Sequence, residues 1–304
     1  MSEMIERIAA LKKEKNAVIL AHTYQPGEVQ DIADYVGDSY GLSVEATRVE
    51  AEVIVFCGVR FMAETAAILN PSKTVILPEP KAGCPMADMI TPEELAGMKE
   101  EHPDYLVVCY VNSTAEIKAM SDICCTSSNA LKIVRQIPED KGILFIPDKH
   151  LGSYVKEQTG RNIELWDGFC PTHVKIEPDM VREAKEKHPN APVLMHPEAP
   201  KASRELADAL LSTGGMCTYV VEDDASEYII ATEIGIIHTL KKKAPNKTFY
   251  PLTERALCPN MKRGSVDSTL RALEGTGGER VTVAPETAKK AIASLERMLE
   301  MSKG

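Results

Sequence analysis

The stretch "KAGCPMAD" (residues 81–88) contains a Cys-Pro pair that recurs twice further along the chain. The three pairs are Cys84-Pro85, Cys170-Pro171 and Cys258-Pro259, in steps of 86 and 88 residues (170 − 84 and 258 − 170). With 19 prolines among 304 residues, chance would place proline after fewer than one of the eight cysteines. The spacing therefore predicts a structural unit of about 85 residues that occurs three times.

Short apolar, β-branched runs alternate with helical stretches along the whole chain and follow the same period. Three of these runs end in polar residues, and a hydroxyl residue follows each strand end by 17 residues (39 − 22, 127 − 110 and 213 − 196). The strand-end residues are His22 and Tyr24, Tyr110 and Asn112, and His196 and Glu198; the hydroxyl residues are Ser39, Ser127 and Thr213. Near-continuous apolar strands separated by helices are typical of parallel sheets covered on both faces.

These patterns predict an α/β fold of three similar α/β/α units, with parallel sheets arranged about a pseudo-threefold axis. Because ligands bind beyond the carboxyl ends of parallel strands, the three strand ends should face one central site. We place the units at residues 1–83 together with 262–304, at 84–170 and at 171–261. The segment 284–304 has the pattern of an amphipathic helix, and we expect it to pack back on the first unit.

The composition argues against several other classes of protein. The net charge is −10, and the longest basic run, Lys241–Lys243, is too short for a nucleic-acid footprint. No apolar run approaches the roughly 18 residues that a membrane span needs. We therefore expect a cytoplasmic protein with reduced cysteines, of which Cys57, Cys109 and Cys217 fill the core.

The three cysteines that precede proline are candidate metal ligands. Thiolates brought together from three loops suit a zinc ion or an iron–sulfur cluster, and proline after a cluster cysteine recurs in ferredoxin-type ligation. Three ligands leave one coordination position open to a substrate. From the residues alone, a zinc hydrolase and an iron–sulfur sensor stay open beside a cluster enzyme, although a sensor needs a partner surface and no basic patch is evident.

The polar strand-end and hydroxyl residues are candidates for a substrate site. A hydroxyl beside free helix N–H groups forms an anion site, although a single one is usually only an N-cap. Three of them directed at one axis predict a pocket for a phosphate or a dicarboxylate. His173 lies three residues after Cys170 in "CPTH", and a histidine beside a metal-binding cysteine is a proton-transfer candidate.

The motifs "AHTYQ", "GDS", "FMAETAAIL", "AGCPMADM", "YVNSTAEIKA", "CTSSNA", "PDKHLG", "WDGFCPTH", "MHPEAP", "STGGM", "ATEIG" and "CPNMK" occur in this order along nearly the whole chain. They resemble the quinolinate synthase (NadA-type) family. The resemblance implies three α/β/α domains about a pseudo-threefold axis. It also implies one [4Fe–4S] cluster held by Cys84, Cys170 and Cys258, with the fourth iron open to substrate.

The resemblance further implies an enzyme, a transferase of NAD biosynthesis that condenses iminoaspartate with dihydroxyacetone phosphate into quinolinate, phosphate and water. An aspartate-oxidising enzyme that supplies iminoaspartate would be its functional partner, and neither nucleic acid nor membrane is expected as one. Tyr24, His173 and Glu198 match the catalytic acid–base residues. The substrate pocket would be lined by His22, Ser39, Tyr110, Val111, Asn112, Ser127, His196, Pro197, Glu198 and Thr213, with Met261 and Lys262 close to the cluster.

The sequence departs from the family pattern at two places. Cys258 in "CPNM" is not followed by the further cysteines of a C-x-x-C-x-x-C run that some members carry, so disulfide control is not expected there. In "PDKHLG", His150 takes a position that the motif associates with asparagine, which leaves the role of this residue open.

Overall fold

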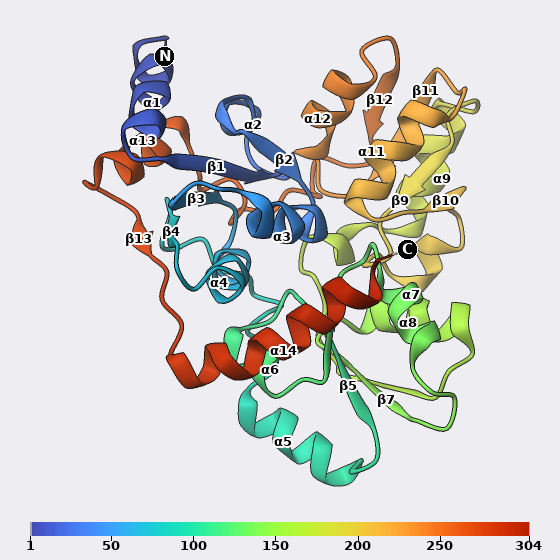
Figure 1. Cartoon of the computed structure of the whole chain (residues 1–304). Coiled ribbons are helices and arrows are strands. Elements are labelled where there is room, and N and C mark those ends of the chain that lie inside the picture. Colours follow the sequence, from blue (N-terminus) through green and yellow to red (C-terminus); the bar gives the residue numbers. More distant parts are fainter. Residues whose placement is uncertain (1, 304) are drawn as a thin grey trace.

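The computed structural model describes residues 2–303 and consists of three α/β units, each built on its own sheet (Figure 1). The strand orders are β2-β1-β3-β4 in the first unit, β6-β5-β7-β8 in the second and β10-β9-β11-β12 in the third. All pairs within these orders are parallel, and each unit repeats the same topology. The prediction of three similar α/β/α units is confirmed.

The first unit also contains elements from the C-terminal part of the sequence. A short strand, β13 (Glu279–Arg280), pairs antiparallel with β4, and helix α13 (Val266–Glu274) packs against α1. The other elements of this unit are α1 (Ser2–Glu14), β1 (Ala17–His22), α2 (Gly27–Ile32), β2 (Tyr35–Gly37), α3 (Ser39–Arg48), β3 (Val53–Cys57), α4 (Arg60–Leu69) and β4 (Thr74–Leu77).

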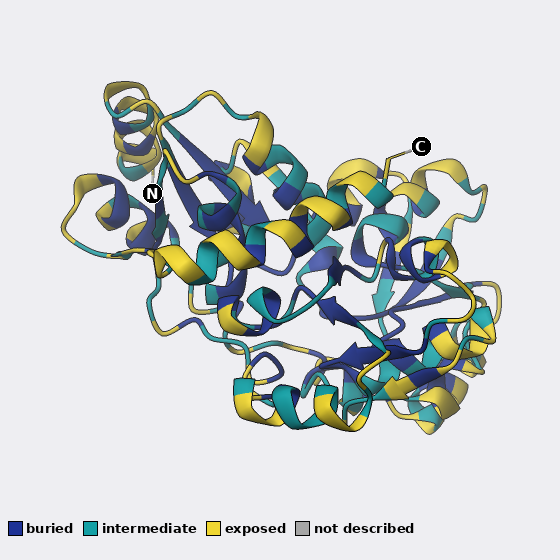
Figure 2. Cartoon of the chain, turned by 60° about the horizontal axis from the view of Figure 1, so that its bottom comes forward, coloured by how far each residue is buried: buried dark blue, intermediate teal, exposed yellow. Residues whose placement is uncertain are grey.

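The second and third units follow the same plan, with central strands that are almost wholly buried (Figure 2). The second contains α5 (Pro92–Glu101), β5 (Leu106–Tyr110), α6 (Ala115–Ala119), β6 (Ile123–Cys125), α7 (Ala130–Gln136), β7 (Ile143–Ile146), α8 (Lys149–Thr159) and β8 (Ile163–Leu165). The third contains the 3₁₀ turn η1 (His173–Lys175), α9 (Pro178–Lys187), β9 (Val193–Met195), α10 (Lys201–Arg204), β10 (Ala209–Leu210), α11 (Thr213–Glu222), β11 (Glu227–Ala231), α12 (Ile236–Lys243) and β12 (Thr248–Pro251).

The last helix, α14 (Pro285–Met301), lies across the first and second units (Figure 1). It packs mainly on α6 and β6 of the second unit and less on α4 of the first. The hydroxyl of Ser294 donates to the Lys118 carbonyl at 2.9 Å. The expectation that this helix packs on the first unit is thus met only in part. Since α6 has only five residues, most of the sheet face beside it needs another apolar helix to cover it.

Cysteine placement agrees with a reduced protein. All eight cysteines are free, and Cys57, Cys109 and Cys217 lie buried in the core as predicted. Among residues 2–303, no helix is both long and apolar enough to cross a membrane. The exact boundaries of the three units stay a prediction.

Candidate active site

A pocket of about 180 Å³ lies where the three units meet, at the carboxyl ends of their central strands. His22 and Tyr110 are the last residues of β1 and β5, and His196 directly follows β9; all three line the pocket. Of the predicted substrate residues, Val111 and Pro197, which lie in a bend and a turn just after β5 and β9, do not line it. The others that line it are Ser39, Asn112, Ser127, Glu198 and Thr213, with Tyr24 and His173 from the predicted catalytic set.

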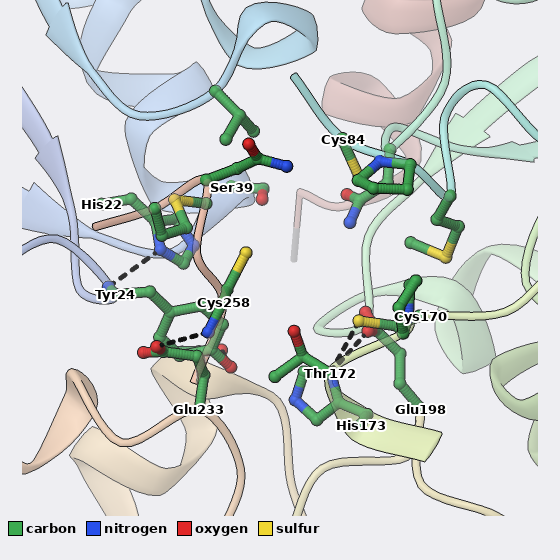
Figure 3. Close-up of a pocket in the computed structure, with 18 of the residues that line it drawn as sticks. His22, Tyr24, Ser39, Cys84, Cys170, Thr172, His173, Glu198, Glu233 and Cys258 are labelled. Carbon is green, nitrogen blue, oxygen red and sulfur yellow. Dashed lines mark hydrogen bonds and ion pairs between the residues drawn. The ribbon is translucent and has the colours of Figure 1, made fainter. Parts of the chain in front are cut away.

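The three predicted metal cysteines reach this pocket from three loops, one associated with each sheet (Figure 3). Burial, together with the nearby Cys258, raises the pKa of the Cys84 thiol to about 12. Burial and the Glu198 carboxylate raise the pKa of the Cys170 thiol well above its usual value. Thiols that resist ionisation beside one another become ligands when a cation offsets their charge. The donor set therefore fits an iron–sulfur cluster, and by its chemistry also zinc.

Each cysteine loop is tied to the sheet by an equivalent backbone hydrogen bond. In each unit, the backbone N–H of the residue three positions after a strand end donates to the carbonyl oxygen of the residue two positions before the cysteine. The pairs are Arg60 to Ala82 at 2.8 Å, Lys149 to Gly168 at 2.8 Å and Ile234 to Ala256 at 3.0 Å. The threefold sequence repeat thus places its three cysteines through the same local contact.

Two buried carboxylates add a second tie. The N–H of Cys170 donates to Asp148 at 3.1 Å, and the N–H of Cys258 donates to Glu233 at 3.0 Å. Glu233 also accepts from Lys262, whose ammonium donates to the Tyr24 carbonyl. The loops of Cys170 and Cys258 are therefore each held by a hydrogen bond to a buried carboxyl group of their own sheet.

Glu198 is the centre of the acid–base group. Its carboxylate lies 2.8 Å from His173 Nδ1 and accepts from the Tyr110 hydroxyl, and the His173 ring stacks on His196 with centroids 4.7 Å apart. Burial alone would raise the pKa of Glu198, but His173 and His196 outweigh it and lower that pKa below its usual range. Burial and the Glu198 carboxylate raise the pKa of Tyr110. Glu198 is thus a buried, ionised acceptor.

His22 and His196 have equivalent orientations in their units. In each case the backbone N–H two residues later donates to Nδ1, from Tyr24 at 3.0 Å and from Glu198 at 3.3 Å. Burial, with Lys262 and His196 nearby, lowers the pKa of His22 to about 3; burial, aided by His173, lowers that of His196 to about 3. Both rings are therefore neutral and carry their proton on Nε2, as hydrogen-bond donors.

The hydroxyl residues differ in their surroundings. Ser39 and Thr213 are the first residues of α3 and α11, as expected, whereas Ser127 lies in a turn before α7 and meets His196 Nε2 at 3.1 Å. The Asp38 side chain forms hydrogen bonds close to all three of these hydroxyl residues. Its carboxylate accepts from Gly41 N at 2.8 Å in its own unit, from Ser128 Oγ at 2.7 Å and from Gly214 N at 3.2 Å.

One smaller set could hold a single metal ion. The ligand atoms of Cys170, His173 and Glu198 all lie within 4.8 Å of one another. His173 Nδ1 is 3.2 Å from the Cys170 sulfur. His150, in contrast, does not line the pocket, and its Nε2 has no hydrogen-bond partner among the described residues.

Several polar residues around the pocket were not singled out from the sequence, among them Asp38, Asp148, Thr232 and Glu233. Each of these four stands within two residues of a strand end, in the motifs "GDS", "PDKHLG" and "ATEIG". Asp148 and Glu233 both come two residues after a central strand, at equivalent places of the repeat. This equivalence is the signal by which Asp148 and Glu233 could have been found from the sequence.

The comparisons with known proteins agree with one another. The family model "Quinolinate synthetase A protein" matches residues 6–300. The quinolinate synthase of Dehalococcoides mccartyi (strain CBDB1) is 52% identical over 295 residues, 97% of each chain. That of Methanosarcina barkeri is 52% identical over 298 residues, 98% of this chain and 97% of the relative. That of Caldicellulosiruptor saccharolyticus is 50% identical over 302 residues, 99% of each chain.

Proposed function

Because the chain belongs to the quinolinate synthetase A family, we propose that it is a quinolinate synthase of NAD biosynthesis. It condenses iminoaspartate with dihydroxyacetone phosphate and releases quinolinate, phosphate and water. The observation that carries this proposal is that three cysteines and three sets of polar strand-end residues line one pocket between the units. An aspartate-oxidising enzyme would supply the unstable iminoaspartate. A reducing cytoplasm suits the free thiols.

Cys84, Cys170 and Cys258 are the residues that would hold a [4Fe–4S] cluster. With three protein ligands, the bound cluster would supply a Lewis acid at the iron that lacks one. The protein's own part is to hold the ligand loops in place through Asp148 and Glu233.

Substrate binding falls to neutral donors. The Nε2–H groups of His22 and His196 can donate to the carboxylates or carbonyl of the substrates without a competing charge change. The N-terminal ends of α3 and α11, which begin at Ser39 and Thr213, suit the phosphate of dihydroxyacetone phosphate, because helix N–H groups stabilise anions. In a protein with a net charge of −10, these local dipoles and Lys175, which lines the pocket, would attract the anionic substrates.

Proton transfer falls to Glu198, His173 and Tyr24. Each elimination removes a proton from carbon and delivers one to a departing oxygen, so the site needs a base and an acid at fixed positions. Glu198, ionised and buried, serves as the base. Burial raises the pKa of Tyr24, which keeps its phenol protonated as an acid. His173 lies between the two and can pass a proton from one to the other.

The direct test is anaerobic purification, iron and sulfide counts, and an assay of quinolinate formed from iminoaspartate and dihydroxyacetone phosphate. We expect about four iron and four sulfide per chain and quinolinate that depends on both substrates. Cluster-loaded protein that forms no quinolinate would contradict the proposal. The Cys170–His173–Glu198 set favours a mononuclear metal hydrolase as the second candidate; colourless protein with stoichiometric zinc would support that enzyme instead.

A further inference from the structure

Thr232, the residue directly after β11, connects two of the proposed acid–base residues. Its Oγ1 lies 2.8 Å from His173 Nε2 and 2.7 Å from the Tyr24 hydroxyl. The Tyr24 hydroxyl in turn lies 2.8 Å from Thr213 Oγ1, and His173 Nδ1 lies 2.8 Å from Glu198. A continuous line of hydrogen bonds thus runs from Thr213 through Tyr24, Thr232 and His173 to Glu198.

The donors and acceptors of this line have one consistent assignment when the His173 ring is neutral. A carboxylate only accepts, so His173 Nδ1 carries a proton toward Glu198 and its Nε2 accepts. The Thr232 hydroxyl then donates to Nε2. Its single proton is used there, so Tyr24 donates to Thr232 and accepts from Thr213. Through the Thr232 hydroxyl, the orientation of the His173 ring therefore fixes that of the Tyr24 phenol.

The threefold repeat shows that this side chain is not a general feature of the strand ends. The register pairs Ala21 with Cys57, Cys109 with Ile146 and Met195 with Ala231. The residues that follow the second member of each pair are Gly58, Pro147 and Thr232. Neither glycine nor proline has a side-chain hydrogen-bonding group, so only the third unit has one here.

The buried Thr232 hydroxyl would destabilise the protein if it formed no hydrogen bond. Thr232 is 1% exposed, and a buried hydroxyl without a partner destabilises a protein by about 1–3 kcal/mol. Valine has the same shape and would fill the space without that cost. The hydroxyl is therefore explained by its two partners and not by packing.

We infer that Thr232 is a positioning residue, whose hydroxyl holds the His173 ring and the Tyr24 phenol in the mutual orientation that turnover requires. The expected effect on kcat rests on the proposed function, whereas the orientation of the two rings by Thr232 does not depend on it. Thr232 does not line the pocket, so it acts through its two partners and not on substrate.

The test compares Thr232→Val, which removes the hydroxyl, with Thr232→Ser, which keeps it. We expect Thr232→Val to lower kcat by about 10- to 100-fold, because small misplacements of catalytic groups cost this much, with KM changed less than about twofold. Thr232→Ser should restore most of kcat. Iron content should equal that of wild type in both variants.

Thr269→Val is the matched control, since Thr269 is also fully buried and bonded through its hydroxyl but lies on α13 away from the pocket. It should change thermal stability without lowering kcat. Wild-type kcat in Thr232→Val, or equal loss in Thr232→Val and Thr232→Ser, would overturn the inference.

Crystal structures of wild type and Thr232→Val give the second readout. We expect the Tyr24 hydroxyl or the His173 ring to leave its wild-type orientation in the variant, and unchanged rings would overturn the inference. If wild-type protein forms no quinolinate, the proposed function fails, while this comparison still decides whether Thr232 orients the two rings.

Discussion

The backbone N–H of Cys258 donates a hydrogen bond of 3.0 Å to the Glu233 carboxylate, which is wholly buried. Both carboxylate oxygens are occupied, since Glu233 also accepts from Gly235 N at 2.7 Å and from Lys262. In the first unit the equivalent position holds Val59, and the loop of Cys84 is held differently: besides the backbone bond from Arg60 N to the Ala82 carbonyl, the Arg60 guanidinium donates to the Pro80 carbonyl at 3.0 Å. The three ligand loops are therefore equivalent in topology but are held by different side chains.

Glu233→Gln should weaken retention of the cluster. An amide presents a donor where the carboxylate accepted, so its N–H₂ would face the N–H of Cys258 or of Gly235, or the Lys262 ammonium. We expect a stability loss of about 1–3 kcal/mol and clearly less iron per chain after anaerobic purification. Glu227→Gln, in the same unit but at a side chain that accepts from the Tyr250 hydroxyl and not from a cysteine loop, is the control and should keep its iron. Full iron occupancy in Glu233→Gln would contradict the predicted bracing role.

Cys170→Ala should abolish both the cluster and quinolinate synthesis, because a cubane with two remaining cysteine ligands is not retained. Iron counts and the quinolinate assay measure the two effects separately. Cys217→Ala is the control, since this buried cysteine lies in the core and its loss should reduce stability but leave the iron in place. A Cys170→Ala protein that is free of iron and fully active would refute the cluster enzyme.

Glu198→Gln should separate the cluster from turnover. The substitution keeps the size of the side chain but removes its charge and replaces one of the two acceptor oxygens, which face His173 and the Tyr110 hydroxyl, by an N–H₂ donor. We expect wild-type iron content with kcat lowered by about 100-fold or more, the usual contribution of a general base. Normal turnover in this variant would exclude Glu198 as the base.

Much of the fold could be read from the sequence because the repeat is carried by residues with few alternatives. Cys84, Cys170 and Cys258 keep one spacing, and the central strands are long apolar runs. The strands β2, β8, β10 and β12 have two to four residues and lie beside a single partner, so their pattern is too short to identify. Helix α14 packs on the sheet face that the short helix α6 leaves uncovered. No local sequence pattern shows which face that is.

The candidate site was partly predictable for the same reason. Residues that recur once per unit, such as His22 and His196, could be found by their spacing. Thr232 has no equivalent in the other units, so the repeat gave no signal for it. The contact of Asp38 with Ser128 and Gly214 joins three units and exists only in the folded chain.

Asp38→Asn should weaken binding of the phosphate substrate. Asparagine is as good an N-cap as aspartate, so α3 keeps its cap, but the amide cannot accept from both Ser128 and Gly214. Since Gly214 directly follows Thr213, we expect the KM for dihydroxyacetone phosphate to rise about tenfold with a smaller change in kcat. Thr91→Ala, which removes the cap of α5 far from the pocket, is the control and should leave KM unchanged. An unchanged KM in Asp38→Asn would contradict this role.

The stability of the protein should fall as the pH drops below about 6.5, partly because of His22. Burial lowers the pKa of this ring to about 3 in the folded protein, while the unfolded chain takes up the proton near 6.5. The unfolded state therefore binds more protons between these values, and lowering the pH from 6.5 to 5 should cost about 2 kcal/mol for this one residue. His22→Asn can still accept from Tyr24 N but does not titrate. Its melting temperature, measured from pH 7.5 to 5 at a fixed scan rate, should fall less steeply than that of wild type. Equal slopes for wild type and His22→Asn would show that the His22 ring is not held neutral.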